Sequence, residues 1–334
     1  MAYYLIGIDL GGTKLSAGLT DTDGRVIRLE REPVATPWDV RQTVAAMAAI
    51  AHRVAQDVPA AAVLAVGVAI CGVVDRQAGT VKASPALGWH DVHLKDDLRE
   101  RLPWDVFVGN DNGLATLAEW QHGGGRGTES LLGVYVGTGV GAGLILDGRL
   151  YEGRHFAAGQ LGRVFLPVGG TNGFGQRRGR LEEIASGPAL CHRVLRALLA
   201  GEPSMIKMTT GGVVTPEEIG RAEREGDSLA LRAIAESADA LGVVIANAVT
   251  LLDPDRVVLG GGVVRAIPTL PARVREVVRR HGDWGMACPH EVTPAEFGRE
   301  APIIGAALLA RTAGRLATES MATGGTRKMG ETGR

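Results

Sequence analysis

Two acidic residues stand at the ends of short apolar runs, where a carboxylate could act on a phosphate or a hydroxyl group. Asp9 follows the run 5–8, and Asp111 lies just beyond the run 106–108. Short apolar runs of this kind predict buried strands. Open α/β sheets place ligand-handling groups at the carboxyl ends of their strands. Both acids are therefore candidates for chemistry.

A second interpretation exists for the acid of the later run. Asp111, or Asn112 after it, could serve only as the cap of the helix expected at 113–120. Asn110 and Asp111 stand together at this strand end, and the rest of the pattern favours a chemical role for the pair.

Three glycine-containing turns follow predicted strands, at 11–14 (Gly-Gly-Thr-Lys), 137–139 (Gly-Thr-Gly) and 260–262 (Gly-Gly-Gly). The first two can bring backbone N–H groups close to an anion, and the bare backbone of the third could lie flat against an adenine or a ribose. None of them is a Walker loop or the Gly-x-Gly-x-x-Gly turn of dinucleotide folds. Each alone could be an ordinary tight connection. The first two share a strand–turn–strand design, which predicts two related halves that bind one phosphate chain.

The composition is that of a folded enzyme. The chain has 334 residues, 45% hydrophobic and 22% charged, with a net charge of −1. This length suits about two domains, and the charge predicts no attraction to nucleic acid or to a membrane surface. Three widely spaced cysteines suit a reducing cytoplasm rather than a disulfide framework. We see no signal peptide and no bilayer-spanning run.

The periodicity predicts alternating strands and helices, and hence an α/β fold. We expect strands at 5–8, 26–29, 63–70, 106–108, 131–136, 143–146 and 257–259, and helices at 39–57, 94–102, 113–120, 188–200, 215–224, 228–252 and 303–316. Segments 87–92 and 153–187 read as loops. The expected domains are 1–112 and 113–317, with the final helix able to pack back on the first domain, and a disordered tail at 318–334.

Five motifs in this order give the chain a family likeness over residues 5–316. It resembles the ROK family (repressors, open reading frames and kinases) of the actin-like ATPase superfamily. The matching segments are 9–14, 67–75, 110–112, 137–141 and 260–262. The resemblance implies a two-domain actin-like ATPase (ribonuclease H-like) α/β fold with a central cleft for ATP and a sugar.

The resemblance also implies roles for individual residues. Asp111 would be the catalytic base, and the residues expected to bind the acceptor are Gly72, Asn110, Asp111, Gln160, Arg163 and Glu182. The residues expected to bind ATP and Mg²⁺ are Asp9, Gly11, Gly12, Thr13, Lys14, Gly137, Thr138, Gly139, Gly260, Gly261 and Gly262.

The chain departs from the family pattern between residues 160 and 182. Gln160-Leu-Gly-Arg163 replaces a Glu-x-Gly-His segment that contacts the sugar and supplies a zinc ligand, and segment 173–182 lacks the three zinc cysteines but keeps Glu182. A structural zinc site needs four ligands, so we predict no zinc. We expect Arg163 and Arg180 to pair with Glu182 or Glu183 instead. Cys71 stands where the family has proline.

These observations predict an ATP-dependent kinase that phosphorylates a primary hydroxyl group. The altered segment favours an amino sugar such as kanosamine, or a valiolone-type C7-cyclitol, over the alternative, an ordinary glucokinase. A non-catalytic ROK sugar-binding regulator is less favoured, because Asp9 and Asp111 are both retained and no helix-turn-helix precedes the first motif. The family likeness implies a homodimer, and we expect a cytoplasmic enzyme without nucleic-acid or membrane partners.

Overall fold

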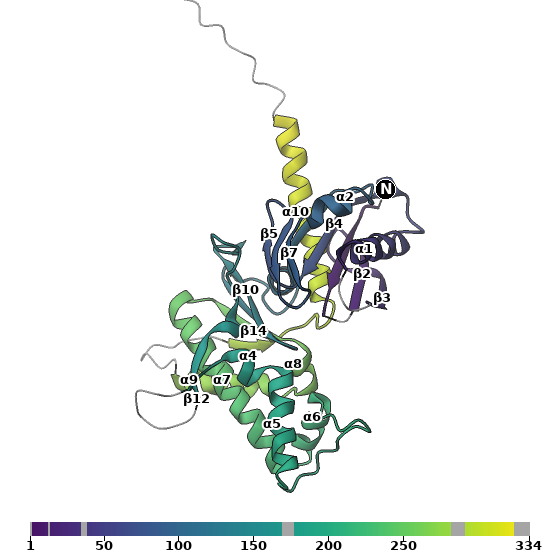
Figure 1. Cartoon of the computed structure of the whole chain (residues 1–334). Coiled ribbons are helices and arrows are strands. Elements are labelled where there is room, and N and C mark those ends of the chain that lie inside the picture. Colours follow the sequence, from purple (N-terminus) through teal and green to yellow (C-terminus); the bar gives the residue numbers. More distant parts are fainter. Residues whose placement is uncertain (1, 13, 35–38, 169–176, 282–290, 324–334) are drawn as a thin grey trace, which may run out of the picture. The chain divides into compact units, whose positions relative to one another are not determined.

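The computed structural model describes residues 2–12, 14–34, 39–168, 177–281 and 291–323. The chain forms two compact units (Figure 1). Unit 1 comprises Met1–Leu114 and Pro302–Arg334, and unit 2 comprises Ala115–Ala301. The chain thus passes between the units twice, once within α3 (Asp111–His122) and once at the start of α10 (Ala301–Thr323).

Unit 1 is built on a five-stranded sheet of order β3-β2-β1-β4-β8. Its strands are β1 (Tyr4–Leu10), β2 (Lys14–Asp21), β3 (Val26–Pro33), β4 (Val63–Ile70) and β8 (Val106–Asn110). The first three form an antiparallel meander, whereas β4 pairs in parallel with both β1 and β8. The carboxyl ends of β1, β4 and β8 therefore meet at one edge of the sheet.

Successive side chains of β1 point to opposite faces of the sheet, and a helix covers each face. Ile6, Ile8 and Leu10 belong to the core that includes α1 (Val40–Val54). On the opposite face Leu5 packs with residues of α10. A Cβ atom added to Gly7 would lie only 2.0 Å from the carbonyl oxygen of Ile303, so α10 rests directly on the strand backbone.

Helix α10 extends further than expected. It runs to Thr323 rather than ending at residue 316, so residues 318–323 are helical and the prediction of disorder there is wrong. Residues 317–323 contain no glycine or proline to stop the helix. The remainder of the expected tail, 324–334, lies outside the described residues.

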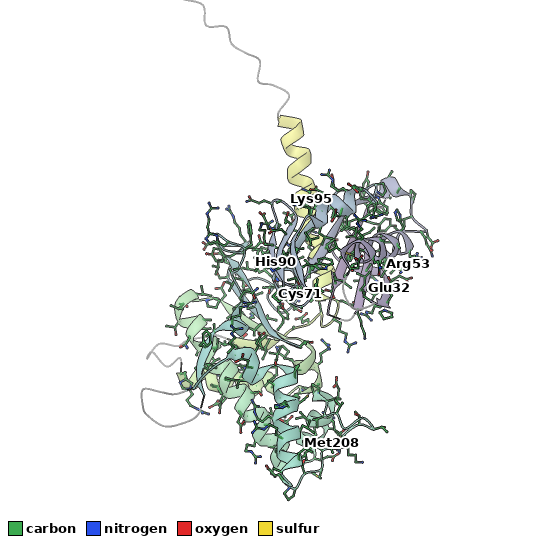
Figure 2. All side chains as sticks on the ribbon, in the orientation of Figure 1. Glu32, Arg53, Cys71, His90, Lys95 and Met208 are labelled. Atoms are coloured by element: carbon green, nitrogen blue, oxygen red, sulfur yellow. The ribbon has the colours of Figure 1, made fainter. Side chains whose placement is uncertain are left out.

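A small three-stranded sheet completes unit 1. It contains β5 (Val73–Asp75), β6 (Thr80–Ser84) and β7 (Trp89–Val92), and α2 (Leu94–Arg99) follows it. The prediction of a loop at 87–92 is therefore wrong, because β7 gains strand structure by pairing with β6. Figure 2 also shows Glu32 of β3 beside Arg53 of α1, where the two side chains form an ion pair.

Unit 2 repeats the strand order of unit 1. Its sheet has the order β11-β10-β9-β14-β15, formed by Arg149–Leu150, Val140–Leu146, Leu131–Val136, Arg256–Gly260 and Glu291–Pro294. As in unit 1, the first pairs are antiparallel and the last two are parallel. A Cβ atom on Gly133 of β9 would lie 2.2 Å from the Thr116 hydroxyl, so α3 lies directly against this strand.

The opposite face of this sheet packs against a layer of helices, and one apolar cluster joins the strands to them. The helices of unit 2 include α5 (Gly187–Leu199), α6 (Pro216–Arg224), α7 (Ser228–Leu252), α8 (Gly262–Ala266) and α9 (Leu270–His281). The described part of the chain contains no helix long and apolar enough to cross a bilayer.

Segment 153–187 contains regular structure, so its prediction as a loop is wrong in part. It holds the 3₁₀ turn η2 (Leu161–Arg163), strands β12 (Phe165–Val168) and β13 (Arg177–Arg180), and helix α4 (Leu181–Ala185). The two strands form a separate antiparallel hairpin. Such short elements are stabilised by their mutual pairing, which local periodicity does not reveal.

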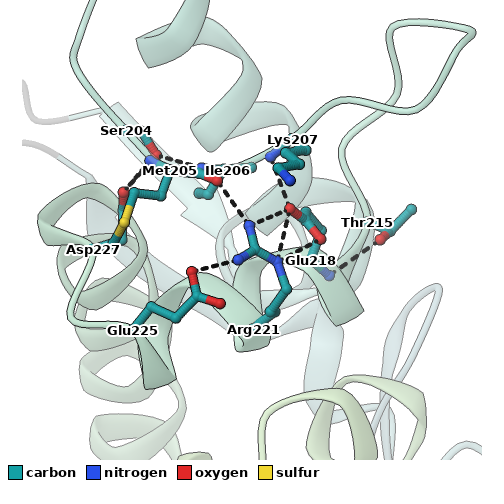
Figure 3. A network of polar contacts seen from close by, with 9 residues as sticks. All are labelled: Ser204, Met205, Ile206, Lys207, Thr215, Glu218, Arg221, Glu225 and Asp227. Carbon is teal, nitrogen blue, oxygen red and sulfur yellow. Dashed lines mark hydrogen bonds and ion pairs between the residues drawn. The ribbon is translucent and has the colours of Figure 1, made fainter.

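Polar contacts anchor the segment between α5 and α6 (Figure 3). The Arg221 guanidinium donates to the carboxylate of Glu218 and to the carbonyl of Met205. The Asp227 carboxylate accepts from the backbone N–H of Met205 at 2.6 Å and from the Ser204 hydroxyl at 2.8 Å. The Arg221 contacts hold the pKa of Glu218 down at about 2. Contacts from α6 and from the N-cap residue of α7 thus fix the conformation of the segment between α5 and α6.

Candidate active site

Asp111 is the first residue of α3, directly after β8. Its Oδ1 atom accepts three hydrogen bonds, from the side-chain amide of Asn110 (3.1 Å), the backbone N–H of Asn112 (2.9 Å) and the side-chain amide of Asn112 (3.0 Å). Burial raises the pKa of Asp111, and the hydrogen bonds partly offset that rise. The carboxylate is therefore oriented and more basic than an exposed one.

Asn110 joins this carboxylate to the neighbouring turn. Its amide also donates to the carbonyl of Gly72 at 2.9 Å, and its Oδ1 atom accepts from the N–H of Gly113 at 3.0 Å. The last contact is that of a helix N-cap. Because Asn110 caps α3, Asp111 is not needed for that purpose.

Gly72 occupies a conformation that favours glycine. Its φ is 125°, and a Cβ atom there would lie 2.4 Å from the carbonyl oxygen of Ala83. The turn after β4 therefore packs tightly on β6 and presents its carbonyl to Asn110. Asn110 and Gly72, both expected to contact an acceptor, also bind each other.

Asp9 lies at the same edge of the sheet as Asp111. It pairs in register with Ala69, which pairs with Gly109. Two strand spacings separate Asp9 from Gly109, about 10 Å. Burial and the charge of Asp111 raise the pKa of Asp9 to about 7, against a smaller opposing effect of Arg31. No described residue donates a hydrogen bond to the Asp9 carboxylate.

Cys71 adjoins these acids and is half-buried (Figure 2). Its sulfur lies 3.5 Å from the hydroxyl of Ser84, within hydrogen-bond reach. Burial and the charge of Asp111 raise the pKa of its thiol to about 11. At neutral pH Cys71 is a protonated, weakly polar side chain rather than a nucleophile.

The first glycine turn closes the β1–β2 hairpin at the same end of the sheet. The N–H of Gly11 donates to the carbonyl of Lys14 at 3.0 Å. Among the described residues that do not adjoin Gly12 in the chain, none has a heavy atom within 4 Å of a Cβ atom added there. The turn therefore leaves open space beside an exposed backbone. Thr13 lies outside the described residues.

The corresponding turn of unit 2 closes the β9–β10 hairpin. The N–H of Gly137 donates to the carbonyl of Gly139 at 2.9 Å, and Thr138 is exposed. The carbonyl of Gly137 accepts from the N–H of Gly187 at the start of α5, at 2.8 Å. A Cβ atom on Gly139 would lie 3.1 Å from a carboxylate oxygen of Glu182, which places Glu182 beside this turn.

The third turn joins β14 to α8. Gly261 has a φ of 101°, and a Cβ atom on it would lie 2.3 Å from the carbonyl oxygen of Val136. Gly260 is buried against Tyr135 and Ala295, whereas a Cβ atom on Gly262 would meet only the Arg265 side chain, at 3.6 Å. These glycines let two turns of unit 2 lie against each other.

Comparison with known proteins now adds to this geometry. A model of the ROK family matches residues 5–313. The chain belongs to the ROK family. It is 31% identical over 316 residues to a glucokinase of Streptomyces coelicolor, covering 92% of this chain and 97% of the relative. It is also 31% identical over 318 residues to a kanosamine kinase of Amycolatopsis mediterranei, covering 92% and 96%.

A solved structure of a ROK family glucokinase from Streptomyces griseus, in complex with glucose and AMPPNP, resembles the model with a TM-score of 0.80. The two chains are 30% identical, and the match covers 92% of this chain and 99% of the other. The predicted family and the predicted α/β fold of the actin-like ATPases are thereby confirmed.

The segment that departs from the ROK pattern lies in unit 2. Gln160 precedes η2 and is partly buried, Arg163 is exposed, and Glu182 is the second residue of α4. A Cβ atom on Gly162 would lie 3.1 Å from a Glu182 carboxylate oxygen, so Glu182 faces η2 as well as the Gly139 turn. The structure thus brings Glu182 close to the Gln160–Arg163 segment.

The arginine pairing expected in this segment is wrong for the described residues. Neither Arg163 nor Arg180 forms an ion pair there with Glu182 or Glu183. Instead the backbone N–H of Arg180 donates to Glu183 at 2.9 Å, and its guanidinium lies 5.8 Å from the ring centre of Phe165. The Glu183 carboxylate, at the third helical position, satisfies the backbone N–H of Arg180 without any contact to an arginine guanidinium.

The described residues also bring together no group of three or more potential metal ligands from histidine, cysteine, aspartate and glutamate. Much of the segment in which the family has its zinc cysteines, 169–176, lies outside them. The absence of zinc stays a prediction.

Asn112 is the residue of this site that motif reasoning did not assign. Its side chain and its backbone both donate to Asp111. The signal in the sequence is the Asn-Asp-Asn triplet itself, in which an amide stands on each side of the acid. Which amide reaches the carboxylate depends on the helix start, and only the structure shows it.

Proposed function

We propose that this protein is an ATP-dependent kinase that transfers the γ-phosphoryl group to a primary hydroxyl of a sugar or a sugar-like acceptor, with Asp111 as general base. The observation that carries the proposal is the Asp111 carboxylate, oriented by three N–H groups at a strand end and made more basic by burial. The glucokinase and kanosamine kinase relatives support the same reaction.

In the proposed step the acceptor oxygen forms a bond to the γ-phosphorus while the bond from that phosphorus to the ADP oxygen breaks. The hydroxyl proton passes to Asp111, and ADP leaves with the electron pair. Because phosphoryl transfer depends mainly on positioning and charge stabilisation, the base serves chiefly to hold the hydroxyl and to take its proton late. A raised pKa suits that role.

We assign phosphate binding to the two hairpin turns, at Gly11–Gly12 in unit 1 and Gly137–Gly139 in unit 2, and adenosine binding to Gly260–Gly262. The open space beside Gly12 supports this, because a ligand can approach the backbone there. The glucokinase crystallised with AMPPNP supports ATP as the donor.

Asp9 fits a magnesium ion. It is a buried carboxylate with a raised pKa, and no described residue donates a hydrogen bond to it. Mg²⁺ is bound in such enzymes through one or two carboxylates, water and substrate phosphates, so Asp9 would hold it. When bound, the ion neutralises negative charge on the phosphates.

We propose that the acceptor is an amino sugar or a C7-cyclitol, with glucose as the alternative. Gln160 and Arg163 replace an acid and a histidine of the ROK pattern, and Glu182 lies beside them. Relatives named glucokinase and kanosamine kinase are equally identical to this chain, at 31% each, so both acceptors are tested. We infer in addition a cytoplasmic homodimer without nucleic-acid partners.

The experiment is a screen of ADP release from ATP and Mg²⁺ with glucose, mannose, N-acetylglucosamine, kanosamine and a valiolone-type cyclitol. Asp111→Asn removes the base but keeps the shape of the side chain, so we expect turnover to fall by about 10²–10⁴-fold. Nucleotide binding, followed by calorimetry, should change little.

The matched control is Asp105→Asn, which alters an exposed acid on the loop before β8 that pairs with Arg99. This variant should keep wild-type turnover. Near-normal turnover of the Asp111→Asn variant would overturn the assignment of the base, and no acceptor-dependent ADP release with any of the five compounds would overturn the proposed activity.

A further inference from the structure

The two oxygens of the Asp111 carboxylate have different surroundings. Oδ1 accepts all three N–H groups described above, two of them from Asn112. None of these three groups donates to Oδ2. The χ2 torsion of an aspartate is broad and nearly two-fold, so an unrestrained carboxylate would exchange its oxygens. Here one oxygen is held and the other is available.

We propose that Asn112 is a positioning residue, whose side-chain amide fixes Oδ1 of Asp111 so that Oδ2 receives the proton of the acceptor hydroxyl. The inference rests on the proposed function, because it assigns a role within that phosphoryl transfer. As the new bond to the γ-phosphorus forms and ADP departs, the hydroxyl proton passes to Oδ2. Asn112 itself touches neither substrate in this role.

The contribution of Asn112 can be separated from that of Asn110. The Asn110 side chain also binds the Gly72 carbonyl and caps α3 through Gly113, so its removal would disturb the turn as well as the base. The Asn112 side chain is partly exposed in the first turn of α3, where the backbone N–H groups have no intrahelical acceptor. Its backbone N–H to Asp111 remains in any variant except proline.

The electrostatic surroundings give the proposal a specific signature. Asp9 and Cys71 lie close enough to Asp111 to couple with its charge, and neither donates a hydrogen bond to it. N–H donors stabilise the ionised carboxylate and so lower its pKa. Loss of the Asn112 amide should therefore move the acid limb of the kcat profile to higher pH. A purely structural change has no reason to move it in that direction.

The test compares Asn112→Ala with Asn112→Ser, using the acceptor that gives the highest turnover in the screen above. Alanine removes the donor, whereas serine keeps an O–H group that can donate. We expect kcat of Asn112→Ala to fall about tenfold with its acid limb shifted upward, while the KM for ATP changes less than about threefold. Asn112→Ser should recover part of kcat and part of the shift.

Thermal melting of both variants measures stability separately. The inference is overturned if Asn112→Ala keeps kcat within about twofold and an unshifted acid limb. It is also overturned if both variants lose kcat equally, in proportion to lost stability, with no shift of the limb. If Asn112→Ala does not fold, the Asn112→Ser variant decides alone. An acid limb of its kcat profile at higher pH than in the wild type supports the inference, and an unshifted limb overturns it. Failure of the proposed function appears instead in the wild-type protein, as no acceptor-dependent ADP release, and failure of the base assignment appears as normal turnover in Asp111→Asn.

Discussion

The β1–β2 hairpin of unit 1 and the β9–β10 hairpin of unit 2 are built alike. Gly7 pairs with Gly18 in the first, and Gly133 pairs with Gly143 in the second. In each hairpin a helix packs directly against the glycine of the first strand: α10 contacts Gly7, and α3 contacts Gly133. A turn containing two glycines follows in both. The same hairpin scaffold, with a glycine-containing turn at its end, is therefore present twice.

The two hairpins differ at one matched position. Two residues after the helix-contacting glycine, β1 carries Asp9 and β9 carries Tyr135. Burial raises the pKa of both side chains, but Asp9 has no described donor, whereas the Tyr135 hydroxyl accepts from Thr116 at 3.4 Å. The raised pKa keeps Tyr135 neutral. The comparison shows that the scaffold is shared, whereas a carboxylate stands at the matched position only in unit 1.

Separate substitutions of the two matched residues, Asp9 and Tyr135, test this difference most directly. Asp9→Asn should lower turnover by roughly 10²–10³-fold, because the proposed magnesium ligand loses its charge. Tyr135→Phe removes a neutral hydroxyl and should change turnover by less than about threefold. Steady-state ADP release measures both. Equal losses in the two variants would contradict the division of roles.

Alanine at the two helix-contacting glycines probes the shared scaffold. A Cβ atom at Gly7 meets the backbone carbonyl of Ile303 at 2.0 Å, whereas one at Gly133 meets the side chain of Thr116 at 2.2 Å. Gly7→Ala should destabilise the protein by about 3 kcal/mol and Gly133→Ala by about 1–2 kcal/mol. Urea denaturation measures both values.

The side-chain contact also allows a rescue that the backbone contact does not. In the Gly133→Ala variant, Thr116→Ala removes the hydroxyl that meets the added Cβ atom, and we expect it to restore part of the lost stability. No such change is available for Gly7. If Thr116→Ala lowers the free energy of unfolding of the Gly133→Ala variant as much as it lowers that of the wild type, the steric explanation fails.

The smallest effect is expected at the turns themselves. A Cβ atom added to Gly12 or to Gly137 would have no heavy atom of a described, non-adjacent residue within 4 Å, and neither glycine has a positive φ. Gly12→Ala and Gly137→Ala should therefore leave stability within about 0.5 kcal/mol of the wild type. If the space is used by phosphate, each should raise the KM for ATP by about tenfold. An unchanged KM in both would mean that the turns bind no nucleotide.

The strands with strong apolar patterns could be predicted from the sequence. The runs at 5–8, 63–70 and 131–136 lie within β1, β4 and β9, because buried parallel strands are continuously hydrophobic. The helix α9 (Leu270–His281) and the edge strand β15 (Glu291–Pro294) were not predicted. The four residues of β15 become a strand only because β14 pairs with them.

The candidate site, too, could be predicted only in part. A carboxylate at a strand end is visible in the sequence, and Asp9 and Asp111 do lie at one edge of one sheet. Hydrogen-bond assignments are not visible in the sequence, so the alternative interpretation gave the cap to Asp111 or Asn112, although Asn110 supplies it. The contacts of Asn112 depend on where α3 begins, and a shift of one residue would redirect them.

The position of α10 has a consequence for how the chain is made. The face of the unit 1 sheet that carries Leu5 and Ala65 is covered by Ala307 and Ala310 of α10, which the ribosome reaches only after all of unit 2. Because translation proceeds at about 5–20 residues per second, that face of the sheet stays uncovered for roughly 10–40 s. Unit 2, which is continuous in sequence, can complete its core first. The nascent protein therefore carries an unfinished first half throughout the synthesis of its second.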